Sequence, residues 1–497
     1  MKKFANILFI TSILSFGCDS ILDEEPVSII DPERFYSTET DAVAAIAGVY
    51  HRLLSNDAFS IQIDIYFGVN HDLLSPTRIL GAGQQFYAYN WDESTPRVRT
   101  VWQRLYQAVN DANLLIAETE NADFAEEVRR EIIAEGTFLR GFTYYYLTAM
   151  YGDVPYITAP TIGESFTENA TASRVSANEI RQNIVSELIA VENDLPDARR
   201  TDFPQRATQW AAKCLKMKCY LWLEDYAGAK ATAQDIIDNS GHSLLPNYAD
   251  IFLEDNEFNN EIIFTFDYLT EEVPTNRAAR FSPRGQDDGI PAANRPPVFA
   301  LGFGFFTMYE SFAKTFDPND LRRSSNIFDQ LEDGTPLLYN YVPKQWRVND
   351  PRGDTGLNYK FYRMADVYLN LAEAENELNG PTQIAYDAIN EVRNRAGLAP
   401  LSGLTQESLR DAIRRERAWE LVGEGNHRKM DLLRWGTLGQ ALQDRLAAEQ
   451  ADPDAANNLK ASIQRTVDNF ADHKVLLPIP TDEILLNTRL TQNPGYN

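Results

Sequence analysis

Cys18 is the residue whose surroundings indicate the clearest chemistry. An apolar run over residues 4–14 follows Lys2 and Lys3 and ends close to the cysteine. A basic end, a short apolar run and small residues before a cleavage point are typical of a secretory signal peptide. The run is too short to cross a bilayer, which needs roughly 20 apolar residues. We therefore expect residues 1–17 to be removed as a lipoprotein signal peptide and the Cys18 thiol to carry a lipid anchor.

Two positions before the cysteine depart from the usual lipoprotein pattern. Leu14 lies four residues before it and the bulky Phe16 lies two before it, so an ordinary cleaved signal peptide is the alternative. Residues 18–35 are acidic and are predicted to form an extended tether. They serve either as a plain solvated linker or as an address for the outer face of the membrane, and both interpretations stay open.

The sequence lacks the motifs that would indicate catalysis or metal binding. None of the 5 histidines belongs to a His-Glu-x-x-His motif or a metal-ligand pair, and no Gly-x-Ser-x-Gly elbow occurs. Each Gly-x-Gly pair lacks the third glycine of a dinucleotide-binding loop. We expect a protein that is not an enzyme and has no cofactor or metal. One acidic stretch could bind a hard cation but is interpreted as a solvated loop; it contains Asp250, Glu254, Asp255 and Glu257.

The composition is that of a large acidic globular protein. The chain has 497 residues, 44% of them hydrophobic, and a formal net charge of −26. This charge argues against a nucleic acid partner and against electrostatic adhesion to anionic lipid. Cys214 and Cys219 lie too far apart on one predicted helix to form a disulfide, so we expect two core thiols.

Apolar residues recur at helical spacing through most of the chain after residue 36. The segments predicted as helices are 40–53, 98–118, 127–150, 206–224, 227–239, 359–378, 382–396 and 409–423. Residues 206–239 and 362–395 each form a helix–turn–helix unit of 34 residues, the length of a tetratricopeptide hairpin. Stacked hairpins build a curved surface suited to a protein partner.

Residues 269–356 interrupt the helical pattern. They are rich in Pro, Gly, Asn, Asp and Arg, and strand-like runs stand at 262–266 and 338–342. A long irregular segment inside a compact chain is usually functional. We therefore divide the mature chain into a helical region at 36–268, a loop-rich ligand-binding insertion at 269–356 and a C-terminal helical region at 357–497.

An ordered series of short motifs runs from the first long helix to the C-terminus. It comprises Trp102-x3-Tyr106-x2-Val109-x2-Ala112-Asn113, Glu135-Gly136-x-Phe138-Leu139-Arg140-Gly141, Tyr151-Gly152-Asp153-Val154-Pro155, Tyr362-Arg363-x-Ala365-Asp366, Arg415-Glu416-Arg417-x2-Glu420, Asp431-Leu432-x-Arg434-Trp435-Gly436, Leu477-Pro478-Ile479-Pro480 and Asn493-Pro494-Gly495-Tyr496. Through these motifs the chain resembles the SusD/RagB family of nutrient-binding lipoproteins over essentially its whole length.

The resemblance implies a mainly α fold, in which a scaffold of tetratricopeptide-like hairpins carries a loop-rich subdomain with short strands. It also implies a lipid-anchored protein on the surface of the outer membrane. Such a protein captures a nutrient, usually an oligosaccharide, and delivers it to a SusC-like TonB-dependent transporter on a separate chain. Charged residues in the motifs are expected to pair and lock helices together: Arg363, Asp366, Glu373, Arg393, Glu416, Arg417 and Glu420.

Recognition of a sugar needs aromatic platforms for the ring and planar hydrogen-bonding groups for its hydroxyls. Two loop regions, 72–91 and 280–346, combine these residue types. The ligand-binding residues that we expect are Asp72, Arg78, Tyr89, Trp91, Phe281, Phe303, Phe305 and Trp346. Asp72, Arg78 and Trp91 also lie where the resemblance places ligand contacts. The alternative for each aromatic residue is packing within its own loop.

Three other functions stay open. The chain could bind peptides for the same kind of transport system, or it could be a scaffold lid with no tight ligand of its own. A surface hydrolase would need a pair of carboxylates in a cleft, which one sequence cannot show.

The lipid anchor is tested by metabolic labelling with palmitate. We expect label on the wild-type chain and none on Cys18→Ala, because the other two cysteines are expected to be core thiols. Equal labelling of the two proteins would contradict the assignment.

Overall fold

The computed structural model describes residues 36, 38–69, 71–77, 84–163, 165–284, 302–347 and 354–497. Cys18 and Arg78 lie outside these residues. The described chain is mostly helical with a few short strands, which confirms the predicted fold class. Among its helices, none has the length and apolar character needed to span a membrane.

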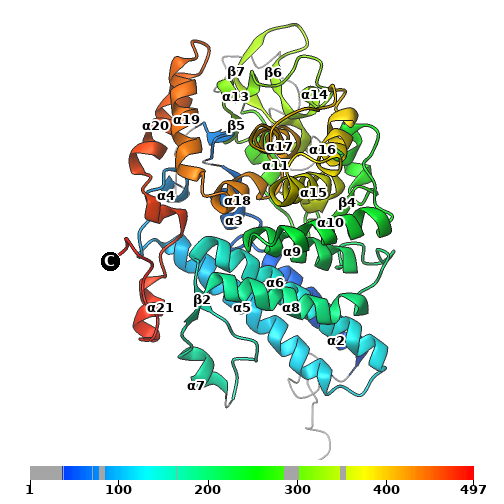
Figure 1. The fold of residues 1–497 in the computed structure, drawn as a ribbon. Helices are drawn as coiled ribbons and strands as arrows, with labels where there is room; N and C mark the ends of the chain where they lie inside the picture. Colours follow the sequence, from blue (N-terminus) through cyan, green and yellow to red (C-terminus); the bar gives the residue numbers. More distant parts are fainter. Residues whose placement is uncertain are drawn as a thin grey trace, which may run out of the picture.

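Four long helices form one layer, in the lower half of Figure 1. They are α2 (Glu39–Leu54), α5 (Pro96–Glu120), α6 (Glu126–Tyr151) and α8 (Ala177–Val191). Helix α2 begins at a capping box, in which the Thr38 side chain accepts from the Asp41 N–H and the Asp41 carboxylate accepts from the Thr38 N–H. The predictions for α2, α5 and α6 are correct to within two residues; α8 was not predicted.

The two predicted hairpins stack directly on one another. They consist of α9 (Gln209–Trp222) with α10 (Tyr226–Asn239), and α15 (Met364–Asn379) with α16 (Gln383–Arg395). Helix α10 packs against α15, and α17 (Gln406–Leu421) packs against the other side of the second hairpin. Gly380 ends α15 with a φ of 82°, a conformation that favours glycine, so the chain turns sharply into α16.

The predicted helix at 359–378 is wrong at its start. Residues 359–363 form strand β8 (Tyr359–Arg363), which pairs antiparallel with β4 (Ile262–Phe266). All five residues of each strand are buried, so backbone pairing inside the core decides the conformation there. Phe264, Phe266 and Phe361 form a cluster of edge-to-face and tilted rings between these strands and helix α6.

A second sheet joins the two segments predicted as ligand loops. Its order is β1 (Leu74–Pro76), β5 (Phe306–Met308), β7 (Pro336–Tyr341) and β6 (Phe328–Gln330). Two C-terminal helices stand beside this sheet, α19 (Leu438–Ala451) and α20 (Asn457–Asn469), following α18 (His427–Arg434). The other short elements are α3 (Gln62–Gly68), α4 (Gln84–Tyr87), β2 (Val154–Pro155), α7 (Ser165–Ala170), β3 (Arg174–Val175), α11 (Arg277–Phe281), α13 (Glu310–Ala313), α14 (Arg323–Asn326) and α21 (Thr481–Leu486).

Cys214 and Cys219 are free, fully buried thiols on α9, which confirms their interpretation as core residues. Burial raises the pKa of the Cys219 thiol to about 12, so it stays protonated and unreactive at neutral pH.

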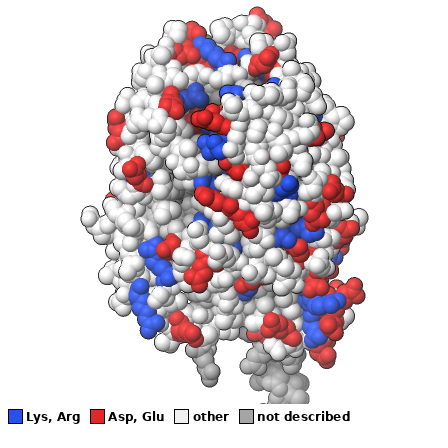
Figure 2. All heavy atoms as spheres, in the orientation of Figure 1, with Lys and Arg blue, Asp and Glu red and all other residues white. Residues whose placement is uncertain are grey.

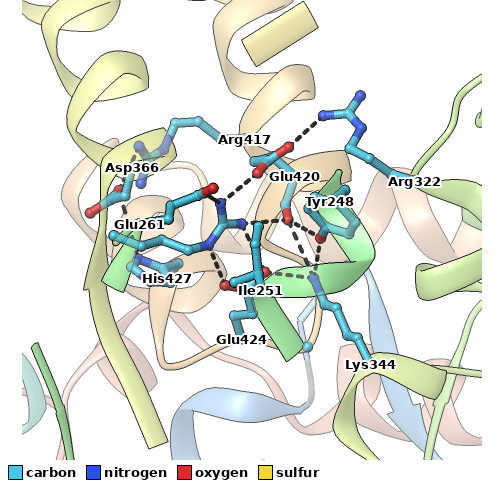
Figure 3. A network of polar contacts seen from close by, with 12 residues as sticks. Tyr248, Ile251, Glu261, Arg322, Lys344, Asp366, Arg417, Glu420, Glu424 and His427 are labelled. Atoms are coloured by element: carbon cyan, nitrogen blue, oxygen red, sulfur yellow. Dashed lines mark hydrogen bonds and ion pairs between the residues drawn. The ribbon is translucent and has the colours of Figure 1, made fainter. Parts of the chain in front are cut away.

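A buried network of ion pairs joins the central strands β4 and β8 to α17 and α18 (Figure 3). Arg363 binds Glu261 at 2.8 Å, Glu420 at 2.5 Å and Glu424 at 2.6 Å. Lys344 binds Glu424 at 2.6 Å. The expected lock between helices is confirmed, and further pairs extend it: Arg322–Glu416, Arg322–Glu420, Arg393–Glu416, Arg417–Asp366, Arg417–Asp431, Lys218–Asp366 and Arg434–Glu373.

The network keeps its carboxylates ionised. Burial alone would raise the pKa of Glu424, but Arg363 and Lys344 outweigh burial and hold this pKa at about 2. The pKa of Glu420 is likewise held well below its usual range by Arg395, Arg363 and Arg322, although burial opposes them. The folded pKa of Glu424 lies below its unfolded value of 4.5, so its contribution to stability is complete above that pH. The contribution is lost as the pH falls towards 2.

Replacement of Glu424 tests this network. Glu424→Gln leaves Arg363 and Lys344 facing a neutral amide, so the free energy of unfolding at pH 7 should fall by about 3–5 kcal/mol. The variant should also lose less stability than the wild type between pH 4.5 and 2.5, as followed by urea unfolding and circular dichroism.

The matched control is Asp454→Asn, which removes an acid that pairs with Lys314 at the surface. Because Asp454 is 70% exposed, the change should stay within about 0.5 kcal/mol. The same loss in both variants at pH 7 would contradict a stabilising role for the buried network.

Candidate functional site

The structure brings the two predicted ligand loops together. Strands β1 and β5 pair antiparallel, with Leu74 opposite Met308 and Pro76 opposite Phe306. The pairing continues past the strand ends, since the Thr77 N–H donates to the Phe305 carbonyl at 2.9 Å. Segments more than 200 positions apart in the sequence therefore meet at one end of the sheet.

Backbone hydrogen bonds fix the second loop at this end. The N–H groups of Phe303, Gly304 and Phe305 donate to carbonyls of α11 and of the residue that follows it, at 2.6, 2.9 and 2.9 Å. Gly304 has a φ of +60°, which favours glycine. A Cβ at Gly302 would lie 1.9 Å from the Pro283 carbonyl oxygen, so only glycine allows this approach.

Helix α11 is itself anchored by buried charge. Arg277 and Arg280 bind the two carboxylate oxygens of Asp64 at 2.9 and 3.1 Å. Arg277 also donates to the Gly423 carbonyl at 2.7 Å, next to the buried network. The loop that carries Phe303 and Phe305 thus rests on a rigid support.

We define the loop site as Thr77, Arg284, Phe303, Phe305 and Asn458. The rings of Phe303 and Phe305 are half-buried, with centroids 6.0 Å apart and planes inclined by 58°. Asn458 on α20 donates to the Thr77 carbonyl at 2.7 Å and to the Tyr339 hydroxyl at 2.8 Å. Arg284 is half-buried and lies against Gly304, which stands between the two phenylalanines in the sequence. Partly exposed rings near an amide and an arginine suit a ligand with apolar faces and hydroxyl groups. Asn458 was not predicted, because it lies 381 positions from Thr77 and its sequence context does not indicate this contact.

Three expected ligand contacts are core residues in the structure. Tyr89, Trp91 and Phe281 are 0%, 3% and 0% exposed, so protein covers their ring faces. Trp91 donates from Nε1 to the Tyr496 hydroxyl at 2.8 Å and packs 4.8 Å from the Tyr89 ring. The expectation of exposed platforms is therefore not met at these positions, where packing within the molecule uses the rings.

A buried lysine explains part of this packing. The Lys429 ammonium nitrogen lies 3.8 Å from the centroid of the Tyr66 ring and 4.7 Å from that of Tyr89. Burial lowers the pKa of Lys429 well below its usual range, and its Nζ donates to the Tyr66 carbonyl at 2.8 Å. Trp91 belongs to the same cluster, with its ring centroid 5.7 Å from the Lys429 ammonium nitrogen.

Asp72 and Trp346 lie apart from the loop site. Asp72 stands before β1, at the end opposite Thr77, and its carboxylate binds Arg428 through two hydrogen bonds. Trp346 packs edge-on against Phe328 at 5.0 Å and donates to the Phe281 carbonyl at 3.0 Å, so its ring is partly covered. Arg78 lies outside the described residues.

The described residues contain no group of three or more His, Cys, Asp or Glu side chains placed to hold a metal ion. Within the acidic stretch at 250–257, Glu257 accepts hydrogen bonds from Arg347 and from the Asn358 N–H. It is therefore engaged within the protein.

The sequence matches two family models. Residues 307–496 match the model described as the SusD family, and residues 35–221 match the model described as "Starch-binding associating with outer membrane". A SusD-like protein of Formosa agariphila is 31% identical over 100% of this chain and 99% of the relative. A SusD-like protein of Bacteroides ovatus is 25% identical over 84% of this chain and 80% of the relative.

Solved structures share the fold over most of the chain. A SusD homologue of Bacteroides thetaiotaomicron superposes with a TM-score of 0.78 at 21% identity, over 93% of this chain and 98% of that one. A laminarin-binding SusD-like protein gives a TM-score of 0.76 at 24% identity, over 93% and 100% of the two chains. Binding is the activity that these descriptions name, of starch for one family model and of laminarin for one solved structure. On the full-length match to the Formosa relative and the two family models, this chain belongs to the SusD family.

Proposed function

We propose that this chain is a lipid-anchored protein of the outer-membrane surface that captures an oligosaccharide at the loop site. It would deliver this ligand to a SusC-like TonB-dependent transporter on a separate chain. The observation that carries the proposal is the meeting of β1 and β5, which places Phe303 and Phe305 beside polar groups from two distant segments. The family description of starch binding and the laminarin-binding relative support a glycan as the ligand.

The arrangement of the loop site is suited to a ring-shaped ligand. Two inclined aromatic faces can contact the C–H surfaces of successive sugar residues. Arg284 brings a planar group of N–H donors that matches sugar hydroxyls. The Asn458 N–H groups are bound within the protein, so this amide offers its Oδ1 as an acceptor. Both rings stand on backbone that is fixed to α11, so little ordering would accompany binding.

Titration calorimetry against neutral oligosaccharides and peptides tests this function. We expect saturable binding of at least one oligosaccharide, weakened about tenfold or more by Phe303→Ala combined with Phe305→Ala, because the double variant removes both apolar faces. Saturable binding of peptides without binding of oligosaccharides would show that the ligand is a peptide and not a glycan. No heat with either class would favour a scaffold lid.

Phe203→Ala is the matched control, because Phe203 is 44% exposed and lies outside the loop site. It should leave sugar affinity unchanged. Trp91→Ala should instead lower the melting temperature, since truncation of a buried tryptophan costs about 3–5 kcal/mol. Unchanged affinity in the Phe303 and Phe305 double variant would show that the site lies elsewhere.

A further inference from the structure

A cavity of about 530 Å³ lies at the opposite end of β1 and β5 from the loop site. It opens between the segment that follows β5 and the helices α17, α18 and α19. Its lining includes Asp72, Ser311, Arg414, Arg428, Trp435 and Arg445. We call it the arginine cavity. Three guanidinium groups in one hollow are unusual in a chain with a net charge of −26, whose acidic and basic side chains are otherwise mixed over the face in Figure 2.

Of the three arginines in the cavity, Arg414 has the fewest contacts between its guanidinium and the protein. It is half-buried on α17 and lies 4.6 Å from the centroid of the Trp435 ring. Within the part of the chain that the structure describes, its guanidinium makes no ion pair. Trp435 is held in place by a 2.8 Å hydrogen bond from Nε1 to Glu373, so stacking fixes the direction of Arg414.

The other two arginines are held by the protein. Arg428 binds the Asp72 carboxylate in a two-point pair. Arg445 donates to the Asp72 carbonyl at 2.6 Å and to the Ser311 hydroxyl, and among the described residues it has no ion pair. These contacts leave two guanidinium groups in the cavity without a bound carboxylate.

Several other acids lie near the arginine cavity. Glu373, Glu377 and Asp411 are close enough to act electrostatically on Arg414, but Glu373 pairs with Arg434 and Glu377 pairs with Arg410. Asp444 lines the cavity, is exposed and accepts a hydrogen bond from Gln440. Glu449 is buried, and its carboxylate accepts from the Ser311 N–H at 2.7 Å and from the Ser311 hydroxyl at 2.5 Å. No carboxylate among the described residues forms an ion pair with Arg414, so this guanidinium keeps its hydrogen-bonding capacity for a ligand.

We propose that the arginine cavity is a second binding site, which takes the carboxylate or sulfate group of an acidic saccharide on Arg414. A guanidinium offers two parallel N–H donors that match the oxygens of such a group. The hydroxyls of Thr315 and Thr437 and the amide of Gln440 line the same cavity and can meet sugar hydroxyls. The saccharide part of the inference rests on the proposed function, whereas the anion site rests on the cavity alone.

Titration calorimetry with three matched probes tests the site. The probes are galactotetraose, tetragalacturonic acid and a 6-sulfated galactotetraose. At 20 mM NaCl, at least one acidic probe should bind tenfold or more tightly than galactotetraose, and the acid that does so identifies carboxylate or sulfate as the group. Arg414→Gln should remove this preference, because the amide keeps similar bulk and loses the charge. Raising NaCl to 300 mM should weaken the preference in the wild type.

The matched control is Arg415→Gln, the next residue on α17. Arg415 is exposed, lies over the Trp419 ring and is absent from the lining of the cavity. This variant should keep the preference for the acidic probe. Equal loss in both variants, or no preference in the wild type, would overturn the proposal.

A measurement without oligosaccharides separates this inference from the proposed function. Inorganic sulfate or galacturonate monosaccharide should raise the melting temperature of the wild type and of Arg415→Gln more than that of Arg414→Gln. If the neutral oligosaccharides do not bind, the proposed capture of a glycan at the loop site is contradicted. The stabilisation by sulfate or galacturonate is expected even then. Equal stabilisation of all three proteins would overturn the anion site itself.

Discussion

The pairing of Arg363 with Glu261, Glu420 and Glu424 is the interaction on which the fold depends. All four side chains are almost fully buried, and a buried charge without a partner would cost far more than the pair gains. Glu261 stands before β4, Arg363 ends β8, and the other two acids belong to α17 and the residues after it. The network therefore sets the position of the last helices against the central strands, while the stacked hairpins fill the space around it.

The paired strands β1 and β5 separate the two proposed binding sites, which differ in their chemistry. At one end, glycine-dependent backbone contacts present Phe303 and Phe305, which suit an uncharged ligand face. At the other, Arg414 and Trp435 create a positively charged hollow. Tyr89 and Trp91, from the segment at 72–91, are buried around Lys429. These two aromatic side chains therefore stabilise the core.

Helical spacing predicted the hairpins well, because α10 and α16 bury one face with apolar residues at that period, while α9 and α15 are buried nearly all round. It failed at Tyr359–Arg363, where strand pairing inside the core overrides any local preference. The charged network was recognisable because so many arginines and acids occurred in helix motifs. The site was harder to predict, since composition shows that a loop is aromatic but not which rings face inwards. Trp91 faces inwards and binds the Tyr496 hydroxyl, whereas the backbone of Phe303 is bound to Ala279 and its ring stays partly exposed. These partners are distant in the sequence, so composition does not reveal them.

The long sequence separation within the network also determines which pieces of the chain can fold. A chain that stops near residue 400 would contain Arg322, Lys344 and Arg363 but would lack Glu420 on α17 and Glu424 just after it. Arg322 would keep Asp320 and Arg363 would keep Glu261, but Lys344 would lose its carboxylate partner and the two arginines would lose most of theirs. Burial of this excess positive charge is too costly for the truncated chain to adopt the native core. Folding must therefore wait until almost the whole polypeptide is present, and contacts of such high sequence separation form slowly. An incomplete translation product would stay open to proteases instead of persisting as a folded fragment.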